Sequence, residues 1–236
     1  AMDPWQLIVT PDLPGEKNMR VDLKLFQQLE KGDGQSTLRF YSWQPQCISL
    51  GYSQIIDEEI DLLKARELGW DVVKRPTGGG IVFHNRAEVT YSLVTAIDNP
   101  LLPKEMIPSY KKISEAIVSG LKHLGINAQV KSSPVPSPQS LSPLCFSFPA
   151  EYEIVVGGRK LVGSAQKRGK RALLQQGSIF VRNTDSAAFS LLKKPVNEYN
   201  AVSLEEILGR EISFEEVRAA LINGFKEYLG IKFNED

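Results

Sequence analysis

The chain has 236 residues and a net charge of zero, because 28 Lys and Arg side chains balance 28 Asp and Glu side chains. Nucleic-acid-binding proteins usually carry a basic excess, since phosphate neutralisation supplies most of their affinity, so that class is not favoured. With 42% hydrophobic residues, the chain can bury one sizeable core, and we expect residues 1–236 to form a single domain. No run of about 18 apolar residues occurs, so no transmembrane helix is expected.

The N-terminal residues and the cysteines indicate the compartment. Residues 1–4 lack a basic region followed by an apolar stretch, so we expect no secretory signal and interpret them as a cloning remnant. Two cysteines, Cys47 and Cys145, are too few for a disulfide scaffold. His84 and His123 are far from them in sequence, which argues against a structural zinc site. We therefore expect free thiols in a reducing, cytoplasmic compartment.

Apolar periodicity predicts the secondary structure in chain order. Strand patterns cover residues 5–10, 37–42, 46–52, 71–74, 81–84, 89–95, 151–156, 159–165 and 173–181, and helical patterns cover residues 16–31, 57–68 and 108–124. Gly157-Gly158 predicts a hairpin, because a primed two-residue turn needs positive φ. Ser203 and Ser213, each followed three residues later by glutamate, predict helix starts in a C-terminal helical segment, residues 200–236. The elements together predict an α+β fold with a large mixed sheet.

Cys145 directly follows a segment without periodicity. Residues 131–144, KSSPVPSPQSLSPL, hold five serines and four prolines and are predicted to be a loop. A thiol beside such a loop could reach a substrate and act as a nucleophile that forms an acyl thioester. Alternatively, Cys145 is a semi-buried residue without chemistry. Cys47 lies in a strand of alternating character and is predicted to have a packing role.

Three consecutive glycines form the most unusual motif, Arg75-Pro-Thr-Gly-Gly-Gly80. Without side chains they expose backbone N–H groups, and Arg75 adds a forked cationic donor, so a carboxylate or phosphate could approach closely. The alternative is a flexible connection between strands. The spacing matches neither a Walker loop nor a dinucleotide fingerprint.

Lys160 is a further candidate. Strand alternation predicts that it shares a face with Val162, Ser164 and Gln166. A lysine there could favour a nearby thiolate or hydrogen-bond a carbonyl oxygen that gains charge, and the alternative is a solvated strand lysine. His84 could belong to the site or have a structural role.

His123 is expected at the surface, late in an amphipathic helix. Lys167, Arg168, Lys170 and Arg171 form a basic cluster that could steer acidic partners, or could simply be a solvated turn.

Four motifs in order resemble the lipoate protein ligase family of the biotin/lipoate protein ligase superfamily. They are RFYSWQPQCISLGYSQ at 39–54, KRPTGGGIVFHN at 74–85, GGRKLVGSAQKR at 157–168 and LLQQGSIF at 173–180. Within the family, CFSFPAEYEIVVGGRKLVGSAQKR and RAEVTYS are similar to the ligase-like octanoyltransferases. This resemblance implies that Cys145 accepts the octanoyl group and that Lys160 contacts the acyl carbonyl. The implied substrate-binding residues are Arg75, Thr77, Gly78, Gly79, Gly80, His84, Gly163, Ser164, Ala165, Gln166, Gly177 and Ser178.

The resemblance also implies a fold and a reaction. The fold would be a central mixed β-sheet flanked by helices, as in biotin/lipoate ligase catalytic domains and class II synthetases. Octanoyl-acyl carrier protein would acylate Cys145, and a lysine of a lipoyl domain or of glycine cleavage H protein would accept the group. No cofactor, metal, nucleic acid or membrane would be needed, and we expect a monomer. One alternative is an ATP-dependent lipoate ligase, with ATP and Mg²⁺ and a dispensable Cys145. Another is an inactive homologue that binds carrier or lipoyl domains.

Overall fold

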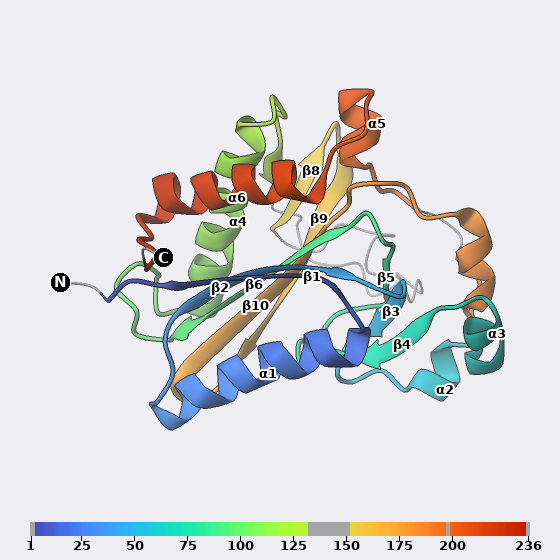
Figure 1. Ribbon diagram of the computed structural model, residues 1–236, viewed down its shortest axis with the longest axis horizontal. Coiled ribbons are helices and arrows are strands. Elements are labelled where there is room, and N and C mark those ends of the chain that lie inside the picture. Colours follow the sequence, from blue (N-terminus) through green and yellow to red (C-terminus); the bar gives the residue numbers. More distant parts are fainter. Residues whose placement is uncertain (1–2, 132–151, 197–198, 235–236) are drawn as a thin grey trace.

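The computed structural model describes residues 3–131, 152–196 and 199–234 (Figure 1). Its larger sheet has seven strands in the order β1-β2-β6-β10-β9-β8-β7. The bounds are β1 Gln6–Leu13, β2 Thr37–Trp43, β6 Val89–Ala96, β7 Gln129–Lys131, β8 Glu153–Val156, β9 Arg159–Arg168 and β10 Ala172–Ile179. Because β1 pairs with β2 in parallel and the other neighbours are antiparallel, this sheet is mixed, as the sequence predicts.

A second sheet of three strands lies at one end of the larger one (Figure 1). Its central strand β3 (Cys47–Leu50) pairs with β4 (Asp71–Lys74) in parallel and with β5 (Val82–His84) antiparallel. Its own apolar core includes residues of α3 (Leu62–Glu67) and of the 3-10 helix η1 (Ser186–Leu191). The strands expected in one large sheet are therefore divided between two sheets.

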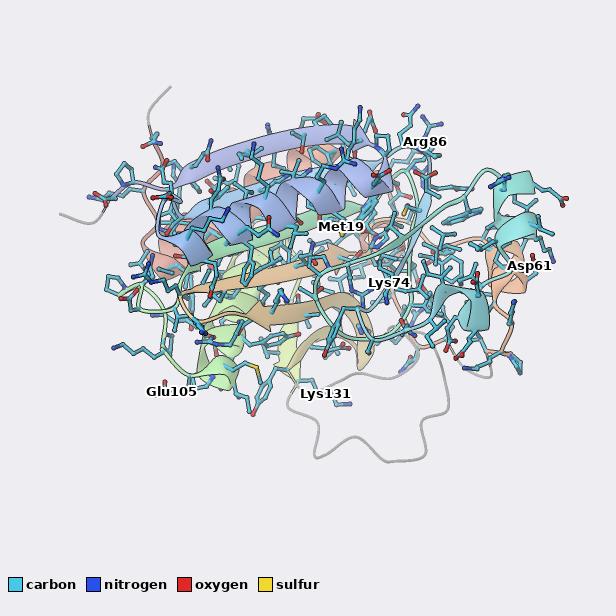
Figure 2. The ribbon with its side chains drawn as sticks, turned by 90° about the horizontal axis from the view of Figure 1, so that it is seen from below. Met19, Asp61, Lys74, Arg86, Glu105 and Lys131 are labelled. Carbon is cyan, nitrogen blue, oxygen red and sulfur yellow. The ribbon has the colours of Figure 1, made fainter. Side chains whose placement is uncertain are left out.

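Helices cover both faces of the seven-stranded sheet (Figure 1). Helix α4 (Met106–Lys122) and helix α6 (Phe214–Leu229) share one apolar core with one face of the sheet. They approach closely because Gly120 and Gly224 lack side chains: a Cβ on Gly224 would lie 2.2 Å from the backbone nitrogen of Gly120. Helix α1 (Gly15–Lys31) lies across the opposite face, which Figure 2 views directly.

Local signals predict most of these elements. Gly157 and Gly158 both have positive φ and turn β8 into β9. Ser213 and Glu216 form the predicted capping box of α6, and Ser203 caps α5 (Leu204–Leu208). The strand β7 was not predicted. Within the described residues, no helix is both long and apolar enough to cross a membrane.

The predicted helix over residues 57–68 is wrong. The structure has two short helices there, α2 (Ile56–Glu59) and α3. Ile60 between them is extended, with φ −123° and ψ 137°, and forms a β-bridge with Leu192. Asp61 then caps α3 by accepting the Lys64 backbone N–H. The tertiary bridge outweighs the helical periodicity that the sequence shows.

Candidate active site

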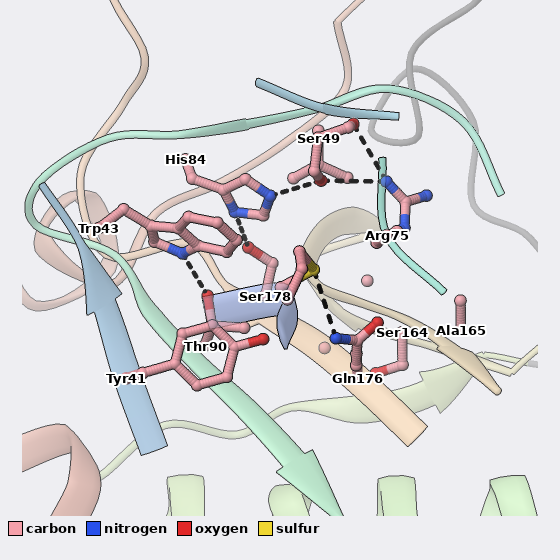
Figure 3. A pocket seen from close by; sticks show the side chains of 14 residues that line it. Tyr41, Trp43, Ser49, Arg75, His84, Thr90, Ser164, Ala165, Gln176 and Ser178 are labelled. Carbon is pink, nitrogen blue, oxygen red and sulfur yellow. Dashed lines mark hydrogen bonds between the residues drawn. The ribbon is translucent and has the colours of Figure 1, made fainter. Parts of the chain in front are cut away.

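A cavity that is partly open to solvent lies where the two sheets meet (Figure 3). Residues predicted to bind substrate line it, namely Arg75, His84, Gly163, Ser164, Ala165, Gly177 and Ser178. The remaining lining residues are Met19, Tyr41, Trp43, Ser49, Val82, Thr90 and Gln176. Every residue of β2 is buried, so its sequence lacks the alternation of polar and apolar residues that could distinguish a site residue from a core residue. For this reason the sequence analysis did not predict Tyr41 and Trp43 as site residues.

Arg75 holds the glycine loop, which we define as residues 77–80. The Arg75 side chain is buried and donates to the carbonyl oxygens of Gly78 and Gly80, at 2.8 and 2.6 Å. It also donates to the carbonyl and hydroxyl oxygens of Ser49, at 3.1 and 3.0 Å. The three glycines lie beside Arg75 but not among the residues that line the cavity. The guanidinium therefore organises the loop as well as forming part of the cavity wall.

His84 belongs to a chain of buried polar side chains along the cavity (Figure 3). Its Nε2 lies 2.6 Å from Ser49 Oγ, and its Nδ1 lies 2.6 Å from a carboxylate oxygen of Glu88. Thr90 donates to the same Glu88 oxygen and accepts from the indole N–H of Trp43, whose ring stacks on His84 at 4.1 Å. His84 therefore has both of the roles considered from the sequence: it lines the cavity and anchors its wall.

Ser164 and Gly177 face each other on neighbouring strands. The Ser164 hydroxyl lies 2.7 Å from the Tyr91 hydroxyl, and Tyr110 donates to the Ser164 carbonyl at 2.9 Å. A Cβ on Gly177 would lie 2.1 Å from the Tyr91 ring and 2.4 Å from Ser164 Oγ, so a side chain does not fit. Gln166 lies away from the cavity lining and donates to Gln175.

Lys160 lies on the other face of β9 from the one predicted. Its side chain is fully buried and forms an ion pair with Glu153, so the alternative of a solvated lysine is wrong. The β8–β9 register shifts between Ile154 and Val155, which inserts one extra residue into β9 between Lys160 and Val162. This bulge breaks strict alternation. Lys160 therefore shares a face with Gly163 and Ala165 rather than with Ser164 and Gln166. Gly163, Ser164 and Ala165 line the cavity, whereas Lys160 and Glu153 are not among its lining residues.

The two cysteines differ in what the structure says of them. Cys47 is buried beside Tyr41 and Trp43, as predicted. Burial, together with the negative charges of Asp71 and Glu88, raises its pKa well above the usual value and keeps it a neutral thiol. Cys145 and the predicted loop after Lys131 lie outside the described residues.

The surface predictions have mixed outcomes. His123 pairs with Glu227 at 2.9 Å on the surface, as expected. Of the basic cluster, Lys170 and Arg171 are exposed, whereas Lys167 lies over the Phe26 ring and Arg168 donates to Ser109 and to a backbone carbonyl. Steering by this cluster stays a prediction.

Comparison with known proteins identifies the family of this chain. Residues 14–226 match the lipoyl protein ligase A/B catalytic domain, and the chain belongs to that family. Octanoyltransferase LipM of Clostridioides difficile (strain 630) is 36% identical, covering 99% of this chain and 90% of that protein. Octanoyltransferase LipM of Kyrpidia tusciae is 38% identical, covering 98% and 89%.

A solved structure is also similar. It is a bipartite lipoate protein ligase from Thermoplasma acidophilum, described together with its E2 lipoyl domain. That chain is 25% identical with a TM-score of 0.74, and the match covers 100% of this chain and 87% of the other. The predicted fold class and family are therefore confirmed.

Proposed function

We propose that the chain transfers an octanoyl group from octanoyl-acyl carrier protein, through a thioester on Cys145, to a lysine of a lipoyl domain or of glycine cleavage H protein. The chain is an acyltransferase of protein lipoylation: curated octanoyltransferases are 36% to 38% identical to it over nearly its whole length. The observation that supports the route most directly is the fully buried Lys160–Glu153 pair, on the face of β9 that also carries Gly163 and Ala165.

The proposed reaction has two displacement steps. First, the Cys145 thiolate attacks the thioester carbonyl of the donor; a new carbon–sulfur bond forms, and the carrier thiolate leaves and takes a proton. Second, the neutral ε-amine of the acceptor lysine attacks the acyl-enzyme. A carbon–nitrogen bond forms, the Cys145 thiolate leaves, and the amine proton is lost. Thioester exchange is nearly neutral and amide formation is downhill, so this route needs no ATP.

Lys160 would stabilise both tetrahedral intermediates. Each attack moves negative charge onto the carbonyl oxygen, and a positioned ammonium lowers the energy of that charge most effectively where water is excluded. Glu153 holds the ammonium in the protein interior, on the face of β9 that also carries Gly163 and Ala165. The fully buried position of Lys160 keeps water away from the ammonium, as such a role requires.

The ATP-dependent ligase is the less favoured route. The ligase structure is 25% identical to this chain, whereas the octanoyltransferases are 36% to 38% identical. The same ligase supports the class of acceptor, since its structure is described together with an E2 lipoyl domain. We propose a lipoyl domain as the first acceptor to test, and a monomer as the active form.

Intact-protein mass spectrometry tests the proposal. The enzyme is mixed with octanoyl-acyl carrier protein without ATP, and we expect a mass gain of one octanoyl group that neutral hydroxylamine removes. Cys145→Ala should show no gain. An enzyme that forms no adduct, but modifies a lipoyl domain with free octanoate or lipoate only when ATP is present, would overturn the thioester route.

A further inference from the structure

We infer that Asp22 is a positioning residue for acyl binding: through Gln176 and Thr77, its carboxylate fixes the glycine loop beside the cavity. The inference rests on the octanoyl transfer proposed above and deepens it. The three side chains come from α1, β10 and the glycine loop, and they form one continuous hydrogen-bonded chain. Asp22 and Thr77 are fully buried, and Gln176 is 5% exposed.

Asp22 ties α1 to the sheet. Its Oδ1 accepts from Arg39 at 2.7 Å and from the Ser92 hydroxyl at 2.8 Å. Its Oδ2 accepts from the Tyr41 hydroxyl at 2.8 Å and from Gln176 Nε2 at 2.7 Å. Four donors from β2, β6 and β10 therefore converge on one carboxylate, and each buried donor has its partner.

The carboxylate determines which way the Gln176 amide points. A carboxylate only accepts hydrogen bonds, so Gln176 must direct its NH₂ group at Asp22. Its carbonyl oxygen is then free to face Thr77, whose hydroxyl donates to it at 2.8 Å. With the amide reversed, an oxygen would face the Asp22 carboxylate, which repels it. The negative charge of Asp22 thus determines that Gln176 accepts, rather than donates, the hydrogen bond from the glycine loop.

The Thr77 hydroxyl joins the glycine loop to the seven-stranded sheet. The other contacts of the glycine loop described here join the loop to the three-stranded sheet. The Thr77 carbonyl accepts from the Tyr52 backbone N–H at 3.0 Å, just after β3. Gly51 packs directly on the loop, since a Cβ there would lie 2.0 Å from the Gly79 carbonyl oxygen. Without the bond to Gln176, the loop would lose this connection to β10. Arg75, which binds the loop carbonyls, would then be less well placed on the cavity wall.

One link of this chain, Gln176, is itself part of the cavity wall, as Figure 3 shows. Met19, from the turn of α1 before Asp22, lines the same cavity. The Met19 sulfur lies 3.6 Å from Gln176 Nε2. Altered anchoring of Gln176 would therefore change the wall that the acyl chain contacts. We expect the effect on the octanoyl donor and not on the lysine acceptor, which reaches the acyl group after the carrier has left.

Thr77→Val tests this inference, because it removes the hydroxyl with little change of volume, and Thr77→Ser is the conservative variant that keeps it. Loss of the bond leaves a buried amide oxygen unpaired, so Thr77→Val should raise the KM for octanoyl-acyl carrier protein roughly tenfold. Thr77→Ser should stay within about twofold of the wild type. The KM for the lipoyl domain should not change. Thr95→Val is the matched control: Thr95 is also fully buried and bonds through its hydroxyl to Ser36 and Asn99, away from the cavity.

Backbone hydrogen exchange over residues 77–80 gives a second readout that needs no acyl substrate. Exchange should be faster in Thr77→Val than in the wild type, in Thr77→Ser and in Thr95→Val. Equal donor KM values and equal exchange rates in Thr77→Val and the wild type would overturn the inference. If the wild type transfers no octanoyl group, the proposed function fails, and the exchange experiment alone decides whether the Thr77–Gln176 bond, the last link from Asp22, positions the loop.

Discussion

Asp22 on α1 and Arg39 on β2 form an ion pair in which neither side chain is exposed, with 2.7 Å between Oδ1 and Nη1. Arg39 also donates to the backbone carbonyl and side-chain oxygen of Asn18, and its guanidinium lies over the Tyr41 ring at 4.0 Å. Removing one partner of such a pair leaves an uncompensated buried charge. The pair therefore links stability to the geometry of the cavity.

Arg39→Met is expected to lower the free energy of unfolding by about 3–5 kcal/mol, because Asp22 remains buried without its counter-charge. Urea unfolding followed by circular dichroism measures this change. Arg20→Met is the control, since Arg20 pairs with Glu16 on the exposed face of the same helix and should change stability little. Equal stability of the two variants would contradict the importance of the buried pair.

Lys160→Ala is expected to slow octanoyl transfer about 100- to 1,000-fold, the usual loss when a donor to a developing oxyanion is removed. Single-turnover rates of acylation and of transfer to a lipoyl domain measure it. Glu153→Gln keeps the ammonium but makes its partner neutral, and should give a smaller loss. Wild-type rates in Lys160→Ala would show that Lys160 does not contribute to octanoyl transfer.

Alkaline pH is expected to destabilise the protein through Tyr91. Burial raises the pKa of Tyr91 from 10.0 to about 12, since its hydroxyl is enclosed by the core. The folded state therefore holds its proton to higher pH than the unfolded state. The contribution to stability is fully present below pH 10 and is lost as the pH rises through about 12. Unfolding free energies measured across this range should fall less steeply in Tyr91→Phe, whereas Tyr52→Phe, at an exposed position, should follow the wild type.

Cys47 is expected to resist alkylation in the native state. Its thiol is buried and its pKa is raised, so little thiolate forms at pH 8. Iodoacetamide labelling with peptide mapping should modify Cys47 only after unfolding in guanidinium. Fast labelling of Cys47 in the native protein would show that this region opens readily.

Gly177→Ala is expected to destabilise the protein by about 1–3 kcal/mol, because a methyl group forces backbone or side-chain shifts in a packed interior. The added Cβ would lie 2.1 Å from the Tyr91 ring. Gly78→Ala is the matched control for stability, since a Cβ there meets no atom within 4 Å. Thermal unfolding should separate the two variants, and equal melting temperatures would contradict the steric argument.

The sequence predicts those parts of the fold that local chemistry determines. Paired glycines give the turn at 157–158, and Ser213 with Glu216 gives the start of α6. The division into two sheets and the break at Ile60 depend on tertiary pairing, which single-sequence patterns do not contain. Much of the cavity lining was predictable because the family motifs place it on consecutive residues, such as 163–165.

The rest of the site depends on contacts between distant segments. The hydrogen-bonded chain of Asp22, Gln176 and Thr77 joins three separate elements. No sequence pattern around these residues indicates that they are hydrogen-bonded to one another. Glu153 stands in a family motif, but its pairing with Lys160 follows from the register of β8 and β9. Side chains alternate along regular parts of β9, but the bulge after Lys160 interrupts this alternation. The prediction ignored the bulge and therefore assigned Lys160 to the wrong face.

The bulge in β9 also limits how this enzyme can be compared with others or altered. One additional residue between Lys160 and Val162 decides which side of the sheet carries the ammonium. Deleting that residue would leave the amino-acid composition of the strand nearly unchanged, yet would turn the lysine toward the apolar layer under α4 and α6. A sequence alignment that opens a gap there would compare lysines that project in opposite directions. Chain length at this one point therefore determines the direction of the Lys160 side chain, just as the residue type determines its charge.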